Sequence, residues 1–521
     1  MVKRAVVLAL ICPLAGLAQE MPRQGQPLVL DLRAGSPVRV PLHLPAGSYI
    51  AGEIAGDVTG LDADLLDEAG VHVRELADGA AGGVDFRILT QSRGMVLQLS
   101  GQGRAQLLLT TIAPPEAQVP PPPEYLSPRI AALADALEDG AGTAGFWAEV
   151  ARTGTPLVEP TGDGAAILTF LWRGAARNVR LWGGPGNDHD WLARLGVSDV
   201  WFASYRVPMD TRLSYRLAPD VPELSGDARS RRVALMATAQ VDPLNRAPWP
   251  ADAPDRFNQS STVTRPDAPR QPGTPPAPEA DPTITSFAYD SALLGNQREI
   301  TIARPKGMNP SDPDLVTLLL FDGEDAIRKL DAPRVIDTLT RQGALPPVLT
   351  VMIPSLDADT RARELPDNDR FADALADELL PLIAARTGID PVPARTVVAG
   401  VSYGGLAAAS VPLRRPEVFG NALSMSGSFW YGHDRDPDGG LPDMAARYAS
   451  KPKLPIRFFI SAGTFEGPRP AAPGIIDTAS TLRDILRLKG YAVSWREYSG
   501  GHDYLVWRGA LADGLIALFG R

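Results

Sequence analysis

The chain has 521 residues, more than one hydrophobic core usually contains, so we expect two or more domains. Its composition of 44% hydrophobic and 21% charged residues is typical of a soluble globular protein, and 50 prolines indicate linkers and turn-rich β structure. A formal net charge of -10 argues against a nucleic-acid-binding protein, although it does not exclude a basic pocket for an anionic ligand.

The first residues have the pattern of a signal peptide. Lys3 and Arg4 precede an apolar stretch that ends at Leu17 and is followed by Ala18. The stretch is too short to span a bilayer, and small residues stand where signal peptidase cleaves. We therefore expect residues 1–18 to be removed, no stable membrane anchor to remain, and the protein to be periplasmic or secreted.

Metal and thiol chemistry are not expected. The single cysteine, Cys12, lies inside the apolar stretch, so the mature chain would contain no thiol for a disulfide, a nucleophile or a metal site. The five histidines are scattered, and no carboxylate cluster has the spacing of metal ligands. The sequence therefore predicts neither a metal nor another cofactor.

Two β-rich regions precede the last part of the chain. Residues 27–113 contain short alternating runs broken by glycine, which predicts a β-sandwich or jelly roll. A proline-rich linker is predicted at residues 114–124. A second β-rich domain is predicted at residues 125–246. Residues 247–282 are rich in Pro, Ala and Asp without an apolar period, which predicts a mobile linker.

Residues 283–521 alternate apolar strand-like runs with helical patterns, which predicts an α/β domain with a mostly parallel sheet. Helices are predicted at residues 371–385 and 478–489. The predicted strands are residues 316–321, 348–353, 396–399, 422–425, 457–460 and 493–498.

A nucleophile elbow is predicted at Ser402. The strand 396–399 leads into the Gly-x-Ser-x-Gly sequence of residues 400–404, and a helical pattern follows it. A serine on such a turn projects its hydroxyl clear of the backbone. The N–H of Tyr403 then faces the developing oxyanion at the positive end of the helix. A glycine turn without function is the alternative, but the strand before it and the helix after it favour the elbow.

A serine nucleophile needs a base, and His502 stands where hydrolase topology places one, in the loop after the last predicted strand. The acid that orients it should follow the strand 457–460. Glu466 is the leading candidate and Asp477 the second. We interpret Asp503, adjacent to His502, as a helix N-cap. His433 lies in a loop rich in Gly, Asp and Pro; it is either solvated or lines the substrate pocket.

A second oxyanion donor is expected after the strand 316–321. The chain continues there as Asp322-Gly323-Glu324, and glycine permits a close backbone approach. The N–H of Gly323 or of Glu324 is therefore the predicted donor.

From about residue 145 onward the chain resembles the enterochelin (ferric enterobactin) esterase family. The resemblance rests on Phe146-Trp147 and on the stretches 170–174, 242–245, 319–324, 361–365, 396–405, 424–430 and 500–503. It implies an α/β-hydrolase domain of the esterase D type behind an Ig-like N-terminal domain. It further implies hydrolysis of the serine trilactone of a catecholate siderophore, with Ser402 as nucleophile, His502 as base and a glutamate at the position of Glu466.

The implied substrate, a ferric tricatecholate, is a trianion and requires basic groups near the cleft. Arg361 matches the family's arginine position and Arg363 is its neighbour, so both are predicted to bind substrate; solvated charges flanking a helix are the alternative. Two other functions stay open. One is an exported carbohydrate or feruloyl esterase, and the other is a non-catalytic protein that binds a glycan or a siderophore.

Overall fold

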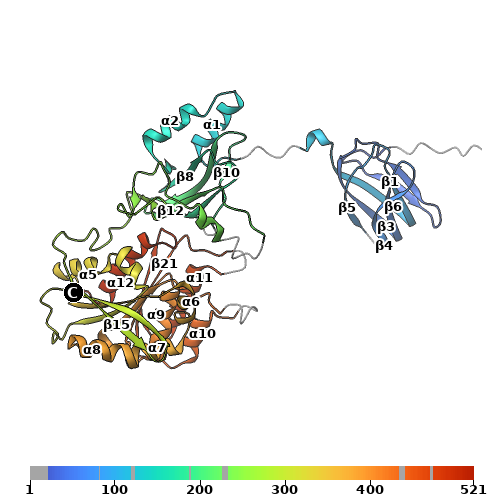
Figure 1. The fold of residues 1–521 in the computed structure, drawn as a ribbon. Helices are drawn as coiled ribbons and strands as arrows, with labels where there is room; N and C mark the ends of the chain where they lie inside the picture. Colours follow the sequence, from blue (N-terminus) through green and yellow to red (C-terminus); the bar gives the residue numbers. More distant parts are fainter. Residues whose placement is uncertain are drawn as a thin grey trace, which may run out of the picture. The chain divides into compact units, whose positions relative to one another are not determined.

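The computed structural model describes residues 21–80, 83–118, 124–186, 189–225, 233–432, 440–469 and 473–521. The predicted signal peptide, residues 119–123 of the first predicted linker, and His433 lie outside these ranges. The chain divides into two compact units, Met1–Pro123 and Glu124–Arg521 (Figure 1). In the described part of the chain, no helix combines the length and apolar character that a membrane crossing needs.

The first unit is an antiparallel β domain around its own core of leucine, isoleucine and valine side chains. The strands are β1 (Leu28–Leu32), β2 (Val38–Pro41), β3 (Tyr49–Leu66), β4 (His72–Ala80), β5 (Val84–Leu89) and β6 (Val96–Ala113). The two longest strands, β3 and β6, pair with each other. The first half of β3 also pairs with β5 and its second half pairs with β4, so the sheet folds over the core. Gly103 allows the close approach of β3 and β6, since a Cβ there would lie 1.9 Å from the Asp57 carbonyl oxygen.

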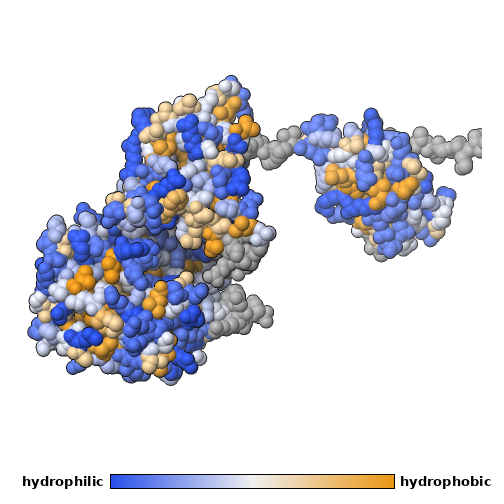
Figure 2. Space-filling view, viewed as in Figure 1, coloured by the Kyte–Doolittle hydropathy of each residue, from blue (hydrophilic) through white to orange (hydrophobic). Residues whose placement is uncertain are grey.

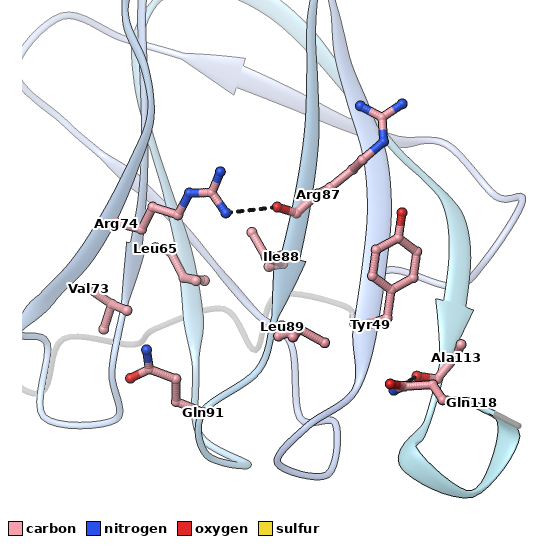
Figure 3. A pocket seen from close by; sticks show the side chains of 10 residues that line it. All are labelled: Tyr49, Leu65, Val73, Arg74, Arg87, Ile88, Leu89, Gln91, Ala113 and Gln118. Atoms are coloured by element: carbon pink, nitrogen blue, oxygen red, sulfur yellow. Dashed lines mark hydrogen bonds between the residues drawn. The ribbon is translucent and has the colours of Figure 1, made fainter. Parts of the chain in front are cut away.

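A hollow of about 700 Å³ opens beside β3, β4 and β5 (Figure 3). Apolar side chains such as Leu65 and Ile88 line it together with the ring of Tyr49, and the guanidinium of Arg74 donates to the carbonyl oxygen of Arg87. Figure 2 shows a band of hydrophobic residues on the visible face of this unit. Among the residues that line the hollow, Leu89 is 57% exposed. The first unit therefore has a surface hollow of its own.

The second unit begins with a β domain that we call the upstream domain. Its helices are α1 (Pro128–Glu138) and α2 (Ala144–Thr153), and two four-stranded antiparallel sheets enclose an aromatic-rich core. The first sheet has the order β10 (Ala193–Arg194), β11 (Val200–Pro208), β8 (Ala165–Arg173), β7 (Leu157–Pro160). The second has the order β13 (Pro248–Trp249), β14 (Ser260–Thr264), β12 (Arg212–Pro219), β9 (Val179–Gly183).

The prediction of a mobile linker at residues 247–282 is wrong. This segment supplies β13 and β14 to the upstream domain. Further along, the N–H of Ala277 donates to Thr338 Oγ1 (3.0 Å) and the N–H of Asp281 donates to Asp337 Oδ2 (3.1 Å). The segment lacks a long apolar period because its buried face on β14 is short, with Ser261 and Val263, and backbone N–H groups hold much of the rest to its neighbours.

The rest of the second unit, the catalytic domain, confirms the predicted α/β class. Its eight-stranded sheet has the order β15-β16-β18-β17-β19-β20-β21-β22, and only β15 (Thr283–Ser291) and β16 (Asn296–Arg304) are antiparallel to their neighbours. The parallel strands are β17 (Val316–Phe321), β18 (Val348–Ile353), β19 (Thr396–Val401), β20 (Asn421–Met425), β21 (Arg457–Gly463) and β22 (Ala492–Tyr498). All six were predicted, to within three residues at their ends.

Helices cover both faces of this sheet (Figure 1), and separate hydrophobic clusters lie on its two sides. The predicted helix at residues 371–385 is interrupted by a π-helical turn, Leu375–Leu379. The helices are α4 (Gly323–Arg328), α5 (Ala332–Arg341), α6 (Ala358–Glu364), α7 (Asp369–Ala374), α8 (Leu380–Thr387), α9 (Tyr403–Arg414), α10 (Asp443–Ser450), α11 (Ile475–Leu488) and α12 (Tyr504–Phe519). Because β17, β19, β20, β21 and β22 run parallel, the loops after them meet at one edge of the sheet.

Candidate active site

Ser402 forms the sharp turn between β19 and α9. Its φ and ψ angles are 57° and −119°, a conformation that side chains with a Cβ rarely adopt. The neighbouring glycines are required by packing, since a Cβ on Gly400 would lie 2.6 Å from the Gly404 backbone and a Cβ on Gly405 would lie 2.8 Å from Gly427 Cα. The turn therefore has the geometry of a nucleophile elbow, with Tyr403 as the first residue of the helix.

His502 and Glu466 form a direct pair at the same edge of the sheet. Nδ1 of His502, in the loop after β22, lies 2.5 Å from Oε1 of Glu466, in the loop after β21. The carboxylate is 2% exposed, and its Oε2 accepts from the N–H of Gly463 (2.6 Å) and from Ser426 Oγ (2.8 Å). The carboxylate therefore assigns a proton to Nδ1 and leaves Nε2 as the basic nitrogen. Asp477, the second candidate for the acid, is exposed on α11.

Ser426 and Trp507 support this pair and were not singled out from the sequence. Trp507 Nε1 donates to Ser426 Oγ (2.9 Å), and the Ser426 hydroxyl in turn donates a hydrogen bond to Glu466 Oε2. The Trp507 ring also meets the His502 ring edge to face, at 4.7 Å between centroids. Both sides of the histidine–glutamate pair are thus held by buried groups. The stretch 424–430, on which the family resemblance partly rests, was the available signal for Ser426.

A second serine lies beside the nucleophile. Ser428 Oγ is 3.3 Å from Ser402 Oγ, and the N–H of Ser428 donates to the carbonyl oxygen of Ser402 (3.0 Å). Ser428 is 1% exposed, so its hydroxyl has few alternative partners. The loop after β20 therefore fixes the elbow from the side opposite to β17.

The predicted oxyanion loop follows β17, and β17 pairs directly with β19. Asp322 adopts a left-handed conformation (φ 55°), and Gly323 begins α4. A Cβ on Gly323 would lie 3.0 Å from the backbone of β18, so only glycine fits without displacement. Glu324 is exposed at the next position. The Asp322 side chain of this loop borders the elbow, because a Cβ on Gly404 would lie 3.5 Å from Asp322 Oδ2.

Arg361 holds the predicted oxyanion loop, a contact that is additional to its predicted role as a substrate ligand. Its Nε and Nη2 donate to the two carboxylate oxygens of Asp322, at 2.6 and 2.8 Å. Burial alone would lower the pKa of Arg361, but the hydrogen bonds to Asp322 raise it. The same guanidinium contacts the Val401 carbonyl oxygen at 3.4 Å and lies over the Tyr403 ring. Arg361 therefore connects the two loops that carry the predicted oxyanion donors. Sequence spacing could not reveal a pair separated by α4, α5 and β18.

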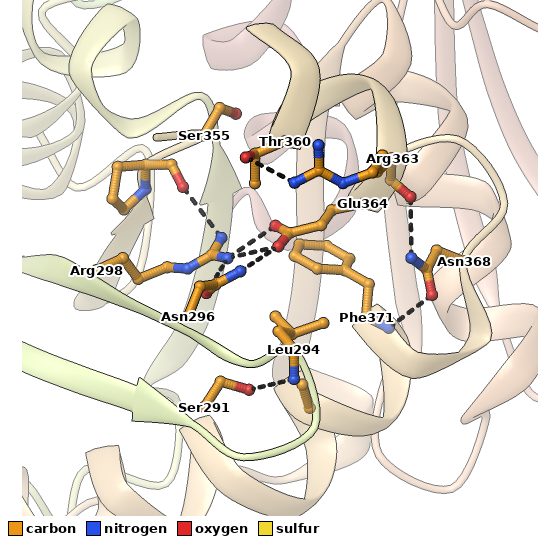
Figure 4. Close-up of polar contacts among 12 residues, drawn as sticks. Ser291, Leu294, Asn296, Arg298, Ser355, Thr360, Arg363, Glu364, Asn368 and Phe371 are labelled. Atoms are coloured by element: carbon orange, nitrogen blue, oxygen red, sulfur yellow. Dashed lines mark hydrogen bonds and ion pairs between the residues drawn. The ribbon is translucent and has the colours of Figure 1, made fainter. Parts of the chain in front are cut away.

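The helix that carries Arg361 is anchored by a buried ion pair (Figure 4). Arg298 on β16 donates through Nη2 to both oxygens of Glu364 at the end of α6, at 2.9 and 2.8 Å. Asn296 adds a hydrogen bond to Glu364, and the Pro354 carbonyl oxygen accepts from Arg298. In contrast, Arg363 is exposed, and its Nη2 donates to Thr360 Oγ1 (3.1 Å).

The family described as "Enterochelin esterase, N-terminal" matches residues 167–274, and the family described as "Putative esterase" matches residues 291–518. An iron(III) enterobactin esterase from Dickeya dadantii is 33% identical over 416 residues, which cover 72% of this chain and 92% of that protein. The chain belongs to the enterochelin esterase family. It is a carboxylic ester hydrolase, and its α/β-hydrolase domain stands behind β domains, as predicted.

Two solved structures of enterochelin esterase family members have the same arrangement. The ferric enterobactin esterase of Salmonella typhimurium is 31% identical, with a TM-score of 0.58, and covers 70% of this chain and 96% of its own. The enterobactin esterase of Shigella flexneri, crystallised in the presence of enterobactin, is 30% identical with a TM-score of 0.56. It also covers 70% of this chain and 96% of its own. The two family matches, residues 167–274 and 291–518, lie within the second unit.

Proposed function

We propose that this esterase hydrolyses the trilactone ester bonds of a ferric catecholate siderophore such as enterobactin and so serves iron acquisition. The observation that carries the proposal is a serine on a strained elbow at the same sheet edge as a hydrogen-bonded histidine and glutamate, in a chain of this family. Relatives named iron(III) enterobactin esterase match along nearly their whole length, which supports the same substrate class.

The chemistry follows from the positions of the three side chains. Ser402 Oγ attacks a lactone carbonyl while His502 Nε2 takes its proton, and Glu466 stabilises the resulting imidazolium through Nδ1–H. The N–H group of Tyr403, together with that of Gly323 or Glu324, stabilises the tetrahedral oxyanion. His502 then returns the proton to the departing serine hydroxyl of the substrate. Water attacks the acyl-enzyme by the reverse proton path, which releases the carboxylic acid and restores Ser402.

The exposed cation in the last turn of α6, Arg363, suits an anionic substrate. The Arg363 guanidinium is solvent-exposed and, within the ranges that the structure describes, forms no ion pair. It therefore supports binding of a trianionic ferric complex. The Arg363→Gln variant should raise KM for ferric enterobactin several-fold and leave kcat/KM for the neutral ester p-nitrophenyl butyrate unchanged; equal effects on both esters would contradict this role.

The substrate is tested directly with ferric enterobactin. The purified protein should convert it to linear dihydroxybenzoylserine products separated by liquid chromatography, and Ser402→Ala should not. Cleavage of ethyl ferulate or acetylated xylan without cleavage of enterobactin would identify a feruloyl or carbohydrate esterase instead. Retention of intact siderophore by the unmodified protein, without any ester cleavage, would identify a binding protein.

We also propose that the protein is exported, to the periplasm or the medium. The basic start, the short apolar stretch and Ala18 support this location. Cell fractionation should recover the protein outside the cytoplasm, with a mass that corresponds to a mature N-terminus at Gln19. A full-length cytoplasmic product would refute export and leave the esterase assignment intact.

A further inference from the structure

The upstream domain contacts the loop that carries the catalytic histidine. The N–H of Arg212, at the start of β12, donates to the carbonyl oxygen of Ser499 (2.9 Å). Two residues further on, the N–H of Ser214 donates to Asp503 Oδ2 (2.5 Å). Between these two bonds Gly501 lies against the upstream domain, since a Cβ there would be 3.1 Å from the Gly184 carbonyl oxygen. Strand β12 thus runs along residues 499–503.

Asp503 joins the two domains through its two oxygens. Oδ1 accepts from the N–H of Leu505 (2.6 Å) and caps α12, as predicted, while Oδ2 accepts from Ser214. The residue is 8% exposed, so its carboxylate has little access to water. The first turn of α12 accepts a further hydrogen bond, from Gln271 Nε2 to the Leu505 carbonyl oxygen (2.6 Å).

The loop that carries Glu466 also contacts the upstream domain. Phe465 immediately precedes Glu466 and packs against the hydrophobic core of the upstream domain. Its N–H donates to the carbonyl oxygen of Gly500 (3.1 Å), which links the glutamate loop to the histidine loop. The upstream domain therefore touches the loops of both His502 and Glu466.

We propose that β12 of the upstream domain is a template for the catalytic histidine loop, and that Asp503 is a positioning residue that acts through His502. The loop begins with Gly500 and Gly501, which alone leave its backbone with many accessible conformations. A displacement of about 1 Å at a catalytic group can reduce the rate about 100-fold. The contacts with β12 remove that freedom. The proposal rests on the proposed ester hydrolysis at Ser402, and not on the identity of the siderophore.

The Asp503→Asn variant separates the two functions of this carboxylate. Asparagine caps helices as well as aspartate does, so α12 keeps its N-cap. Its NH₂ group, however, cannot accept from the Ser214 N–H, so the contact between the domains is lost. We expect kcat for p-nitrophenyl butyrate and for ferric enterobactin to fall about 10- to 100-fold, with KM within twofold of its original value. The Ser214 amide should also exchange its hydrogen faster.

Two further variants make the result decisive. Asp312→Asn makes the same change in a carboxylate that accepts the N–H of Asp314 in the loop before β17, and it should leave kcat and KM unchanged. Gly501→Ala should press the histidine loop away from Gly184 and lower kcat as Asp503→Asn does; it supplies the result if Asp503→Asn does not fold. Unchanged kcat in folded Asp503→Asn or Gly501→Ala overturns the proposal. If these variants lower kcat for the butyrate ester, and neither they nor the unmodified protein cleave enterobactin, the result supports the role of β12 and refutes the proposed substrate.

Discussion

Ser402, the proposed nucleophile, has a strained backbone conformation. An L-residue at φ 57° and ψ −119° is strained by its Cβ, whereas glycine adopts these angles freely. The reactive hydroxyl is therefore placed by a turn that the chain would form more readily without a side chain. The neighbouring loops, through Met425 and Ser428, provide hydrogen bonds that hold the turn in place.

This strain predicts a difference between two inactive variants. Ser402→Ala keeps the Cβ, and Ser402→Gly removes it. The relief of backbone strain should exceed the extra conformational entropy of the unfolded glycine variant, so the free energy of unfolding should be about 1 kcal/mol higher for Ser402→Gly. Thermal unfolding should show a Tm higher by about 2 °C in Ser402→Gly. Equal Tm values would mean that the surrounding loops relax when the side chain is shortened. Both variants should lack esterase activity.

The acid of the site is distinguished by a second pair of variants. Glu466→Gln keeps the shape of the side chain but removes the charge that stabilises protonated His502, so kcat should fall about 100-fold or more. Asp477→Asn changes an exposed carboxylate and should leave kcat within twofold. Steady-state hydrolysis of p-nitrophenyl butyrate measures both. A larger loss in Asp477→Asn would contradict the pairing seen at His502.

At the level of single residues, the sequence was informative wherever chemistry is local. Ser402 was identified from its own turn, and Asp503 from its place before a helix. The partners Asp322 and Arg361 could not be paired, because they meet only after β17, β18 and α6 have been arranged in space. The contact between Asp503 and Ser214 could not be predicted from the sequence either, because it joins two domains.

At the scale of the secondary-structure elements, a cluster of ion pairs stabilises the C-terminal end of α9, away from the nucleophile. Arg415 donates to Asp377 through Nη1 and Nη2, at 2.7 Å each, and to Asp373 and Glu417. Hydrogen bonds from Arg415 lower the pKa of Asp377. Those from Arg414, and then from Arg415, lower the pKa of Asp373.

These shifts give the cluster a defined pH dependence. A carboxylate with a lowered pKa in the folded state adds stability above its unfolded pKa of about 3.9, and that stability is lost as the pH falls through the folded pKa. The Arg415→Gln variant should therefore have a Tm about 1–2 °C lower at pH 7, a small effect because the pairs are exposed. The difference should disappear near pH 2–3. A difference that persists in acid would indicate lost packing instead.

The elements that the sequence predicted well are those buried on both faces. Strands β17 to β21 are mainly buried apolar runs, so each was recognisable, whereas β22 at the sheet edge is only partly buried and is the exception. Strands β15 and β16 at the sheet edge carry polar residues on one side and were missed, and so were β13 and β14 within the proline-rich segment. Their position depends on pairing with distant strands.

At the scale of the molecule, the first unit has its own core, and the active-site residues all belong to the second. A chain that starts at Glu124 should therefore fold and hydrolyse p-nitrophenyl butyrate with kcat within twofold of the whole protein. Calorimetry should show that one unfolding transition is lost and that the Tm of the other changes by less than about 2 °C. Loss of activity on truncation would show that the first unit supports catalysis.

The contact of β12 with the histidine loop also has a consequence for biosynthesis. Domains tend to fold in the order in which they are synthesised, and the upstream domain precedes every active-site residue in the chain. The surface that orders residues 499–503 is therefore available before that loop is made. A chain whose two domains have folded but not yet docked would have native secondary structure without an oriented base, so hydrolytic activity should be the last native property that refolding restores.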